Sequence, residues 1–450
     1  MGKLKIAVLG MGYVGLTSGM AFAKHGFKTV CTTTTPSKAV NLNRGILPFY
    51  EPGLKELVAE FVGKGMLSGS TDNVDAVRQS DVTFICVGTP SLPDGSADLS
   101  SVEDVSRDIG VALRDRDGYH VVVAKSTIPP GTTENIILPN VEKYSGKKAG
   151  RDFGLCMNPE FLRQGEAVHD SLNPDRIVIG QYDKRSGDVL EDVYAEYTCP
   201  KIRCDIRAAE LIKYAANSLL ATKISFANDF SRICERFDID VYEVMKGVGL
   251  DFRINPRFLD AGCGFGGSCF PKDVNAITAL ARRIKVETPV LDAVLHTNDI
   301  QPLHLVDIVR AVLGSLNGKT IAVLGLSFKP NTDDIRATRA LPIVEKLYSE
   351  GARVRAYDPQ AIANFKRLTE LPVEYCEAWE DALRGADAAV VQSDWKEIRD
   401  IRPEDFKRLL KNPVVVDGRR TYDPSLLASK GVKYYGIGWK NSLKSASAKR

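Results

Sequence analysis

The sequence predicts an α/β protein in which a central long-helix domain joins two Rossmann-like, doubly wound domains. Strand-like and helix-like segments alternate over the first 200 or so residues. From Ile206 a helical pattern continues for about 30 residues without Pro or Gly. Strand-like runs among helices return from about residue 315. Such alternation is typical of parallel sheets that helices cover on both faces.

The strands expected in the first domain are short apolar runs, as in a sheet buried on both faces. They are 6–10, 29–33, 82–88, 120–127, 154–159 and 176–180. The later domain repeats the pattern in KTIAVLG, RVRAYDP, AAVVQSD and PVVVDG. We therefore expect domains at 1–200, 201–300 and 301–450, with a disordered basic tail from about 440 to 450. A helix as long as the central one often links domains or packs against a second subunit.

The composition is that of an ordinary soluble protein and gives no argument for a nucleic-acid or membrane partner. The chain of 450 residues is too long for one core. Its 60 basic and 57 acidic residues are nearly balanced, so charge gives no argument for a nucleic-acid or membrane partner. Apolar runs stay short of the ~20 residues of a membrane helix, and no signal peptide is expected. Nine dispersed cysteines without a CxxC pair predict a cytoplasmic protein without a metal site.

The stretch GMGYVG at 10–15 follows a strand and opens a helix, which is the context of a dinucleotide-binding fingerprint. Gly10 permits the tight turn, Gly12 lets the backbone approach a pyrophosphate, and Gly15 lets helix and strand pack closely. The helix N-terminus at Tyr13 and Val14 adds N–H groups and a positive dipole end. The alternative is a tight turn without a ligand.

Four threonines, Thr32 to Thr35, stand where such domains usually place an acid on the ribose. Thr33 lacks the carboxylate that accepts from the ribose hydroxyls and repels a 2′-phosphate. Lys38 or Arg44 would supply positive charge to such a phosphate. We expect NAD with relaxed selectivity, so that NADP is tolerated. The alternative is that Thr33 makes only a weaker ribose hydrogen bond.

Two pairs of residues four apart carry the candidate chemistry. Lys213 and Asn217 share one face of the long helix among apolar neighbours, where Lys can hold an alcohol and Asn an oxyanion. Alone, such a pair is usually solvated surface. Cys269 follows a Gly-rich loop at a predicted helix start, with Asp273 one turn later. A helix dipole lowers a thiol pKa there. A single Cys is more often inert, but the constellation favours a nucleophile.

Ordered segments along nearly the whole chain resemble the UDP-glucose/GDP-mannose dehydrogenase family. They are GMGYVGL, YEPGL, GTP, KSTIPPGT, NPEFLRQGEAVHDSLNPDRIVIG, AELIKYAANSLLATKISFAND, GLDFRINPRFLDAGCGFGGSCFPKDV, LGLSFKPNTDDIR, YDP and VVDGRR. The resemblance implies an N-terminal NAD domain, a central helical dimerisation domain and a C-terminal UDP-sugar-binding domain. Without the resemblance, the residues do not decide the role of the last domain. It would be either a nucleotide-sugar or phosphate site, or a duplicate domain that only packs against the rest of the chain.

The resemblance also implies roles for particular residues. The implied catalytic residues are Cys269 as nucleophile, Lys213, Asn217, Asp273, Thr127 and Glu160. The implied cofactor-binding residues are Gly10, Gly12, Tyr13, Val14, Gly15, Thr33, Lys38, Thr89, Thr127, Gln164 and Arg336. The implied substrate-binding residues are Glu160, Phe161, Leu162, Lys213, Asn217, Arg253 (toward a neighbouring subunit's substrate), Phe258, Gly266, Phe270, Lys329 and Arg419.

The implied reaction is the four-electron oxidation of UDP-glucose to UDP-glucuronate with two nicotinamide cofactors. Cys269 would form a thiohemiacetal and then a thioester, and a water held by Asp273 and Thr127 would hydrolyse it. A homodimer through the central helix is also implied. The chain departs from the family at Thr33 and at Gln164, where Glu is usual. Both changes remove negative charge near the cofactor, which puts an NAD preference in question.

Three alternatives differ in substrate, reaction or class. A UDP-N-acetylhexosamine or GDP-mannose 6-dehydrogenase would use the same mechanism. A two-electron hydroxyacid dehydrogenase can also carry Lys and Asn four apart, but it lacks the GGSCFPKD segment and usually a third domain. A non-catalytic nucleotide-sugar or redox sensor would have no need of a thiol nucleophile.

Overall fold

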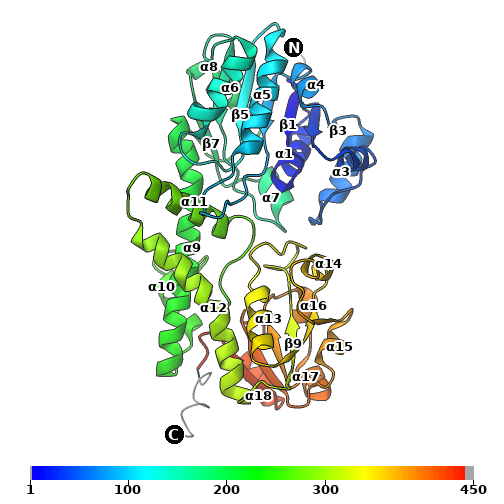
Figure 1. Ribbon diagram of the computed structural model, residues 1–450, viewed down its shortest axis with the longest axis vertical. Coiled ribbons are helices and arrows are strands. Elements are labelled where there is room, and N and C mark those ends of the chain that lie inside the picture. Colours follow the sequence, from blue (N-terminus) through cyan, green and yellow to red (C-terminus); the bar gives the residue numbers. More distant parts are fainter. Residues whose placement is uncertain (1–2, 441–450) are drawn as a thin grey trace. The chain divides into compact units, whose positions relative to one another are not determined.

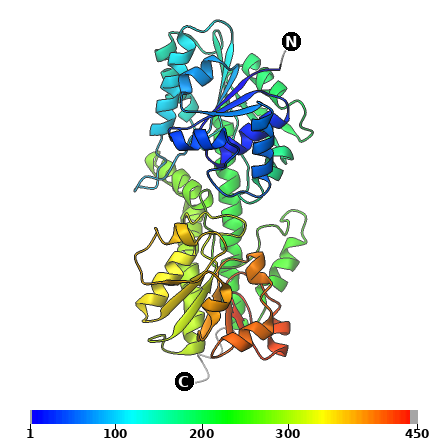
Figure 2. The same cartoon turned by 90° about the vertical axis from the view of Figure 1, so that its right-hand side faces the viewer.

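The computed structural model describes residues 3–440 of the chain (Figure 1). The chain forms two compact units. The first holds Met1–Ala216 and Asn275–Ile284, and the second holds Asn217–Val274 and Lys285–Arg450. Each unit has one sheet with helices on both faces (Figure 2). The expected fold class, two doubly wound α/β parts and a long central helix, is confirmed.

The first sheet has eight strands, and its central strands end at one edge where the candidate cofactor residues follow. In order across the sheet they are β3 (Leu67–Ser70), β2 (Thr29–Thr32), β1 (Ile6–Leu9), β4 (Val82–Ile85), β5 (His120–Ala124), β6 (Phe153–Met157), β7 (Ile177–Gln181) and β8 (Lys201–Cys204). Neighbouring strands are parallel except β6 and β7, which are antiparallel. The sheet is therefore mixed, which corrects the expectation of an all-parallel sheet.

Helices cover both faces of this sheet because its strands are apolar on both sides. They are α1 (Tyr13–Lys24), α2 (Pro36–Leu42), α3 (Leu54–Gly63), α4 (Asn73–Arg78), α5 (Ser100–Arg114), the π-helix η1 (Thr133–Ile137), α6 (Leu138–Ser145), α7 (Ala167–Leu172) and α8 (Lys184–Val193). In β1, Ile6 and Val8 pack in the cluster that contains Leu16 of α1. Ala7 and Leu9 pack in the opposite cluster. This alternation is the pleat of a strand buried on both faces.

Four helices follow the first sheet. They are α9 (Ile206–Phe237), α10 (Val241–Gly249), α11 (Phe270–Arg283) and α12 (Pro289–Leu313). The 32 residues of α9 match the length that its sequence predicts. Buried Glu210 anchors its first turns, because its carboxylate accepts the N–H groups of Gly131 at 2.5 Å and Thr133 at 2.8 Å. Pro302 lies inside α12.

The second sheet has six parallel strands. In order across the sheet they are β11 (Glu374–Tyr375), β10 (Arg353–Tyr357), β9 (Thr320–Leu324), β12 (Ala388–Val391), β13 (Val414–Asp417) and β14 (Lys433–Gly436). Its helices are α13 (Ala340–Ser349), α14 (Ile362–Phe365), α15 (Trp379–Leu383), α16 (Lys396–Arg399), α17 (Pro403–Leu409) and α18 (Pro424–Ser429).

The strands that the sequence failed to predict are β3, β8, β11 and β14, and all four lie at the edges of the two sheets. Edge strands bury less side-chain surface, so they need no continuous apolar run. Strand β8 reads KIRC and is only partly buried. The expected strands 82–88 and 120–127 end earlier, at Ile85 and Ala124. Their last residues form loops.

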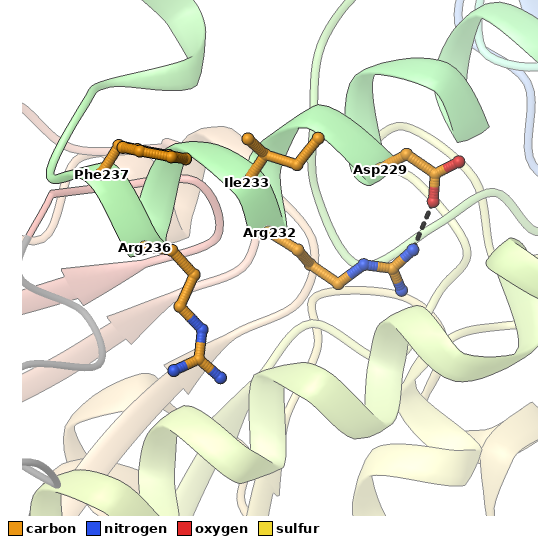
Figure 3. A pocket seen from close by; sticks show the side chains of 5 residues that line it. All are labelled: Asp229, Arg232, Ile233, Arg236 and Phe237. Carbon is orange, nitrogen blue, oxygen red and sulfur yellow. Dashed lines mark hydrogen bonds and ion pairs between the residues drawn. The ribbon is translucent and has the colours of Figure 1, made fainter.

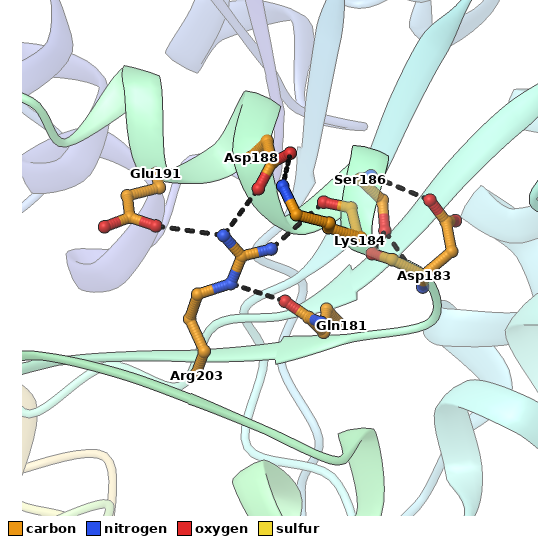
Figure 4. Close-up of polar contacts among 7 residues, drawn as sticks. All are labelled: Gln181, Asp183, Lys184, Ser186, Asp188, Glu191 and Arg203. Atoms are coloured by element: carbon orange, nitrogen blue, oxygen red, sulfur yellow. Dashed lines mark hydrogen bonds and ion pairs between the residues drawn. The ribbon is translucent and has the colours of Figure 1, made fainter.

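A polar network closes the β8 edge of the first sheet (Figure 4). The Arg203 guanidinium donates to Gln181 of β7 at 2.6 Å and to Asp188 of α8 at 2.6 Å. At the start of the same helix, Asp183 accepts the backbone N–H of Ser186 at 3.0 Å as an N-cap. These contacts replace the apolar packing that an edge strand lacks.

The three predicted domains, with boundaries near 200 and 300, remain a prediction. The expected disordered tail from about 440 lies outside the described residues, apart from its first residue. Within residues 3–440, no helix combines the length and apolar character that crossing a membrane requires.

Candidate active site

The fingerprint loop joins β1 to α1 with the backbone geometry that its glycines predict. Gly10 has a φ of +117°, a conformation that favours glycine. A Cβ on Gly15 would lie 1.9 Å from the Gly10 carbonyl oxygen, whereas a Cβ on Gly12 would meet nothing within 4 Å. Helix α1 begins directly after Gly12. The loop thus leaves open space at a helix N-terminus, which fits the pyrophosphate of a dinucleotide.

A buried carboxylate ties this loop region to the FLRQG segment. Tyr13 stacks on Phe49 with ring centroids 3.9 Å apart. Two residues further on, Glu51 is buried and accepts the backbone N–H groups of Gly165 and Ala167, both at 2.8 Å. Glu51 therefore fixes the loop that carries Leu162 and Gln164. The YEPGL segment that contains Glu51 is among those that resemble the family, but the sequence alone predicts no role for Glu51.

The predicted cofactor residues at the other strand ends are accessible or paired with one another. Thr33 directly follows β2 and is half-buried, and its hydroxyl accepts the N–H of Thr35 at 3.2 Å. Lys38 is exposed on α2, and Val14 is half-buried on α1. After β4 and β5, the hydroxyl of Thr89 donates to the carbonyl of Thr127 at 2.8 Å. The structure therefore brings these two predicted threonines together.

A buried ion pair joins the NPEFL segment to α9. Lys213 Nζ lies 2.9 Å from Glu160 Oε1, and the two residues are only 2% and 6% exposed. Glu160 also accepts the backbone N–H of Leu162 at 2.5 Å, and the Lys213 ammonium lies 5.5 Å from the centre of the Phe161 ring. Although burial opposes ionisation, Lys213 and the Leu162 N–H hold the pKa of Glu160 below its ordinary value.

The second unit contains the candidate nucleophile and its neighbours. Cys269 directly precedes α11, and its carbonyl accepts the N–H of Asp273 one turn later at 2.8 Å. The Asp273 carboxylate is buried, accepts from Asn217 Nδ2 at 2.6 Å and pairs with Lys272 at 2.5 Å. Asn217 and Asp273 are the second members of the two predicted pairs, Lys213/Asn217 and Cys269/Asp273. The fold brings them into direct contact.

Burial makes the other thiols poor nucleophiles. It raises the pKa of Cys86 to about 12, of Cys156 to about 12 and of Cys263 to about 11. The direction is the same for the thiols of Cys31, Cys199, Cys204, Cys234 and Cys376. A thiol that stays protonated does not attack a carbonyl carbon, so burial argues against each of these eight thiols as the nucleophile.

Two buried asparagines hold the Gly-rich loop ahead of Cys269. Asn298 of α12 accepts the N–H of Phe265 at 2.7 Å and donates to its carbonyl at 3.0 Å. Asn228 of α9 accepts the N–H of Gly262 at 2.8 Å. Gly264 has a φ of +95°, and a Cβ there would lie 2.5 Å from Asn298 Oδ1. Sequence reasoning missed both asparagines because only the fold reveals their partners.

The predicted substrate residues around this loop lie on several segments. Phe258, with a φ of +67°, meets Phe270 edge-to-face with ring centroids 6.1 Å apart. Gly266 is half-buried in the loop itself.

The predicted basic residues have separate surroundings. Arg336 pairs with Asp334, Arg419 donates to the Gln392 carbonyl at 2.9 Å, and Lys329 is half-buried. The Arg253 side chain is 75% exposed and pairs with Asp251.

The predicted catalytic set divides between the two units. Lys213, Glu160 and Thr127 belong to the first unit, and Cys269, Asn217 and Asp273 to the second. Within residues 3–440, no group of three or more His, Cys, Asp or Glu side chains is arranged to hold a metal ion. The predicted catalytic residues comprise a thiol, an amide, a lysine, a hydroxyl and two carboxylates.

Three family models of the UDP-glucose/GDP-mannose dehydrogenase family match the chain in sequence order. The NAD-binding domain matches residues 4–198, the central domain 207–300 and the UDP-binding domain 322–424. The UDP-glucose 6-dehydrogenase TuaD of Bacillus subtilis is 44% identical over 96% of this chain and 93% of its own length. The UDP-glucose 6-dehydrogenase AglM of Haloferax volcanii is 41% identical over 93% of this chain and 97% of its own.

A solved structure shows the same likeness. The UDP-glucose dehydrogenase of the hyperthermophilic archaeon Pyrobaculum islandicum is 39% identical, and it covers 97% of this chain and 98% of its own with a TM-score of 0.90. These matches extend over both units, so the resemblance found in the sequence is confirmed.

Substitutions of the second and third glycines of the fingerprint, Gly12 and Gly15, should have different effects. Gly15→Ala places a methyl group against the Gly10 carbonyl, and we expect ~1–3 kcal/mol lost from the free energy of unfolding. Gly12→Ala should fold normally but bind a dinucleotide at least tenfold more weakly, about 1.4 kcal/mol, because the methyl group fills the open space. Thermal unfolding and calorimetric titration with NAD measure the two effects. Unchanged NAD affinity in Gly12→Ala would contradict the assignment of this loop to the pyrophosphate.

Proposed function

Because the chain belongs to the UDP-glucose/GDP-mannose dehydrogenase family, we propose that it oxidises UDP-glucose to UDP-glucuronate. The family shows that it is an oxidoreductase with a nicotinamide-binding domain. The 44% and 41% identities to UDP-glucose 6-dehydrogenases favour this sugar over the hexosamine and mannose alternatives. One observation carries the four-electron chemistry. Asn217 Nδ2 donates to the Asp273 carboxylate at 2.6 Å, and Asp273 lies one helical turn after Cys269.

The reaction places a different demand on each residue. The nicotinamide ring, when bound, accepts one hydride from the sugar carbon in each of two oxidations. The first oxidation leaves an aldehyde, and the Cys269 thiolate adds to its carbon to give a thiohemiacetal oxyanion. Lys213 and Asn217 stabilise that oxyanion. Loss of the second hydride leaves a thioester on Cys269.

Hydrolysis completes the reaction and regenerates the thiol. Asp273 and Thr127 hold the attacking water, Glu160 lies beside Lys213, and the C–S bond breaks. Overall, one alcohol, one water and two oxidised cofactors give one carboxylate, two reduced cofactors and three protons. A two-electron dehydrogenase would need neither the thiol nor the water.

The substrate and cofactor groups have candidate partners in both units. The Gly-rich loop with Phe258, Gly266 and Phe270 would hold the uridine nucleotide, and Lys329 and Arg419 would hold its charged groups. Phe161 and Leu162 would line the sugar. Arg253 would reach the substrate of a neighbouring subunit, since its side chain is exposed. Gln164 and Arg336 would contact the cofactor.

Cofactor stoichiometry tests the four-electron path. With UDP-glucose we expect two reduced cofactors per sugar, and Cys269→Ala should lower kcat at least 10³-fold, about 4 kcal/mol, because the aldehyde then lacks a nucleophile. Cys204→Ala is the matched control, because burial already raises the pKa of that thiol. Enzymatic end-point assays of cofactor and glucuronate provide the measurement. One reduced cofactor per sugar would overturn the proposal. A higher kcat/KM for UDP-N-acetylglucosamine or GDP-mannose than for UDP-glucose would show that the sugar is assigned wrongly.

We also propose that NADP is accepted beside NAD. The Thr33 hydroxyl already accepts the Thr35 N–H, so its own proton can be donated to a ribose or phosphate oxygen. Lys38 and Arg44 are exposed nearby in sequence. The end of β2 thus presents a donor where a carboxylate would repel a 2′-phosphate.

Replacing Thr33 should separate the two cofactors. We expect kcat/KM for NAD and NADP to lie within tenfold of each other in the unchanged protein. Thr33→Asp should shift the ratio toward NAD by at least tenfold, about 1.4 kcal/mol. Thr34→Asp, in the exposed neighbouring position, should have a smaller effect. If kcat/KM of the unchanged protein is more than tenfold higher for NAD than for NADP, the threonines have only removed one contact to the ribose.

We further propose a homodimer through α9. Besides Leu211 (46%), four large apolar side chains on this helix are exposed, at spacings of seven, seven and four residues. They are Leu219 (63%), Phe226 (45%), Ile233 (50%) and Phe237 (73%). Such spacing forms one stripe along a helix, which is the pattern of a helix–helix contact.

The end of this stripe is hollowed and charged (Figure 3). A hollow of about 520 Å³ is lined by Asp229, Arg232, Ile233, Arg236 and Phe237. Both charge signs are present, so two copies related by a two-fold axis would match acid to base as well as apolar to apolar. A second copy of the chain is therefore the partner that fits this surface.

Charges in the stripe should separate the dimer. We expect the unchanged protein to have twice its monomer mass in solution, and Phe226→Glu/Ile233→Glu to be a folded monomer because two carboxylates would be buried unpaired. Leu426→Glu, at a 49% exposed position on α18, is the matched control and should remain dimeric. Light scattering after size exclusion gives the masses. A dimer that survives the double change would place the contact elsewhere.

A further inference from the structure

Lys125 is a buried lysine that the proposed mechanism does not use. It directly follows β5 and is 8% exposed. Its ammonium donates to Asn158 Oδ1 at 2.8 Å and to the Tyr194 hydroxyl at 3.4 Å. Among residues 3–440, no carboxylate lies within ion-pair distance of it. Burial accordingly lowers the pKa of Lys125 to about 8.

Lys125 belongs to a cluster of three buried charges. Asn158, which it contacts, lies two residues before Glu160, and Glu160 pairs with Lys213 at 2.9 Å. Burial keeps the other titratable neighbours neutral, because it raises the pKa of Cys86 to about 12 and that of Tyr194 well above its ordinary value. The cluster therefore carries two cations and one anion.

We propose that Lys125 is a positioning residue that keeps Glu160 ionised while Lys213 turns to the oxyanion on the substrate carbon. The inference rests on the proposed function, in which Lys213 serves that oxyanion. A buried carboxylate that loses its ion-pair partner takes up a proton unless a second cation is near. Lys125 supplies the second cation, and its attraction is among the causes that hold the pKa of Glu160 low, after that of Lys213.

The contacts of Asn158 give Lys125 a geometric route to Glu160. The Asn158 amide donates to the Val178 carbonyl at 2.8 Å, and its backbone N–H donates to the Ala124 carbonyl at 2.8 Å. Its Oδ1 accepts from both Lys125 and the Tyr194 hydroxyl, the latter at 2.6 Å. The strand ends of β5 and β6 are thus bound together, which fixes where the backbone delivers Glu160.

The variant Lys125→Met should lose activity without losing stability. Removing a buried charge should leave the melting temperature at pH 7 unchanged or higher, while kcat falls at least tenfold. The acidic limb of the kcat profile should move up by about one pH unit, because Glu160 is then easier to protonate.

The stability difference should itself depend on pH. The pKa of Lys125 is lower in the folded than in the unfolded chain, so the unfolded chain binds the extra proton between about pH 8 and 10.5. The unchanged protein should therefore gain stability as the pH rises through that window. Lys125→Met lacks this gain, so any advantage in its melting temperature should shrink there.

Three variants separate charge from packing. Lys125→Arg keeps the cation and should restore the acidic limb. Tyr194→Phe removes a hydroxyl contact but no charge, and should leave the limb in place. Lys201→Met removes a half-buried lysine whose ammonium donates to the Tyr197 carbonyl at 2.8 Å, and it should change neither the activity nor the acidic limb. A lower melting temperature with an unmoved limb in Lys125→Met would overturn the proposal in favour of a structural role.

A second measurement does not depend on turnover. Carbon NMR of ¹³C-carboxylate glutamate, with the Glu160 signal assigned by Glu160→Gln, reports the ionisation of Glu160 in the full chain. We expect Glu160 to remain ionised at pH 7 in Lys213→Met and to take up a proton in Lys213→Met/Lys125→Met. An ionised Glu160 in the double variant would overturn the proposal. Failure of the unchanged protein to oxidise UDP-glucose would instead overturn the proposed function and leave the NMR result standing.

Discussion

The ion pair between Glu160 and Lys213 is the interaction on which the rest of the first unit depends. Both side chains are almost fully buried, and either charge alone would cost several kcal/mol in that position. The pair therefore fixes α9 against the end of β6, and Glu210 fixes the same helix one turn earlier. A helix repeats every 3.6 residues, so anchoring Lys213 also sets the direction of Asn217. The first sheet and α9 are thereby coupled through charge rather than through apolar packing alone.

The second unit solves a different problem, because its key loop has too few side chains to pack. Backbone groups of a Gly-rich segment must find partners when buried, and here amide side chains provide them. Asn298 matches both backbone groups of Phe265, as a strand would, and Asn228 takes the N–H of Gly262. Cys269 follows this loop within a few residues. The position of the thiol is therefore set by two helices, α9 and α12, distant from it in the sequence.

Sequence patterns predicted the central strands, the length of α9 and the Cys269–Asp273 spacing, because each reflects burial or helical periodicity within one segment. They missed the four edge strands, whose partly polar residues show no apolar pattern. Nor did they predict that β7 runs antiparallel to β6. They also missed Glu51, Asn298 and Lys125. Each of these acts on residues more than thirty positions away, such as Glu51 on Gly165 and Ala167. Only the fold determines those pairings, and a lone Glu, Asn or Lys gives no local signal of them.

The surplus positive charge around Glu160 is best explained by the proposed reaction. A fold selected for stability alone would place an apolar residue at position 125, where an ammonium with two neutral partners costs free energy. Proteins accept such costs at sites that must stabilise charge created during a reaction. In the thiohemiacetal step that we propose, a new oxyanion would arise near one carboxylate, so two negative charges would then require two cations. The cluster of Lys125, Glu160 and Lys213 already contains both cations before the substrate carbon is oxidised.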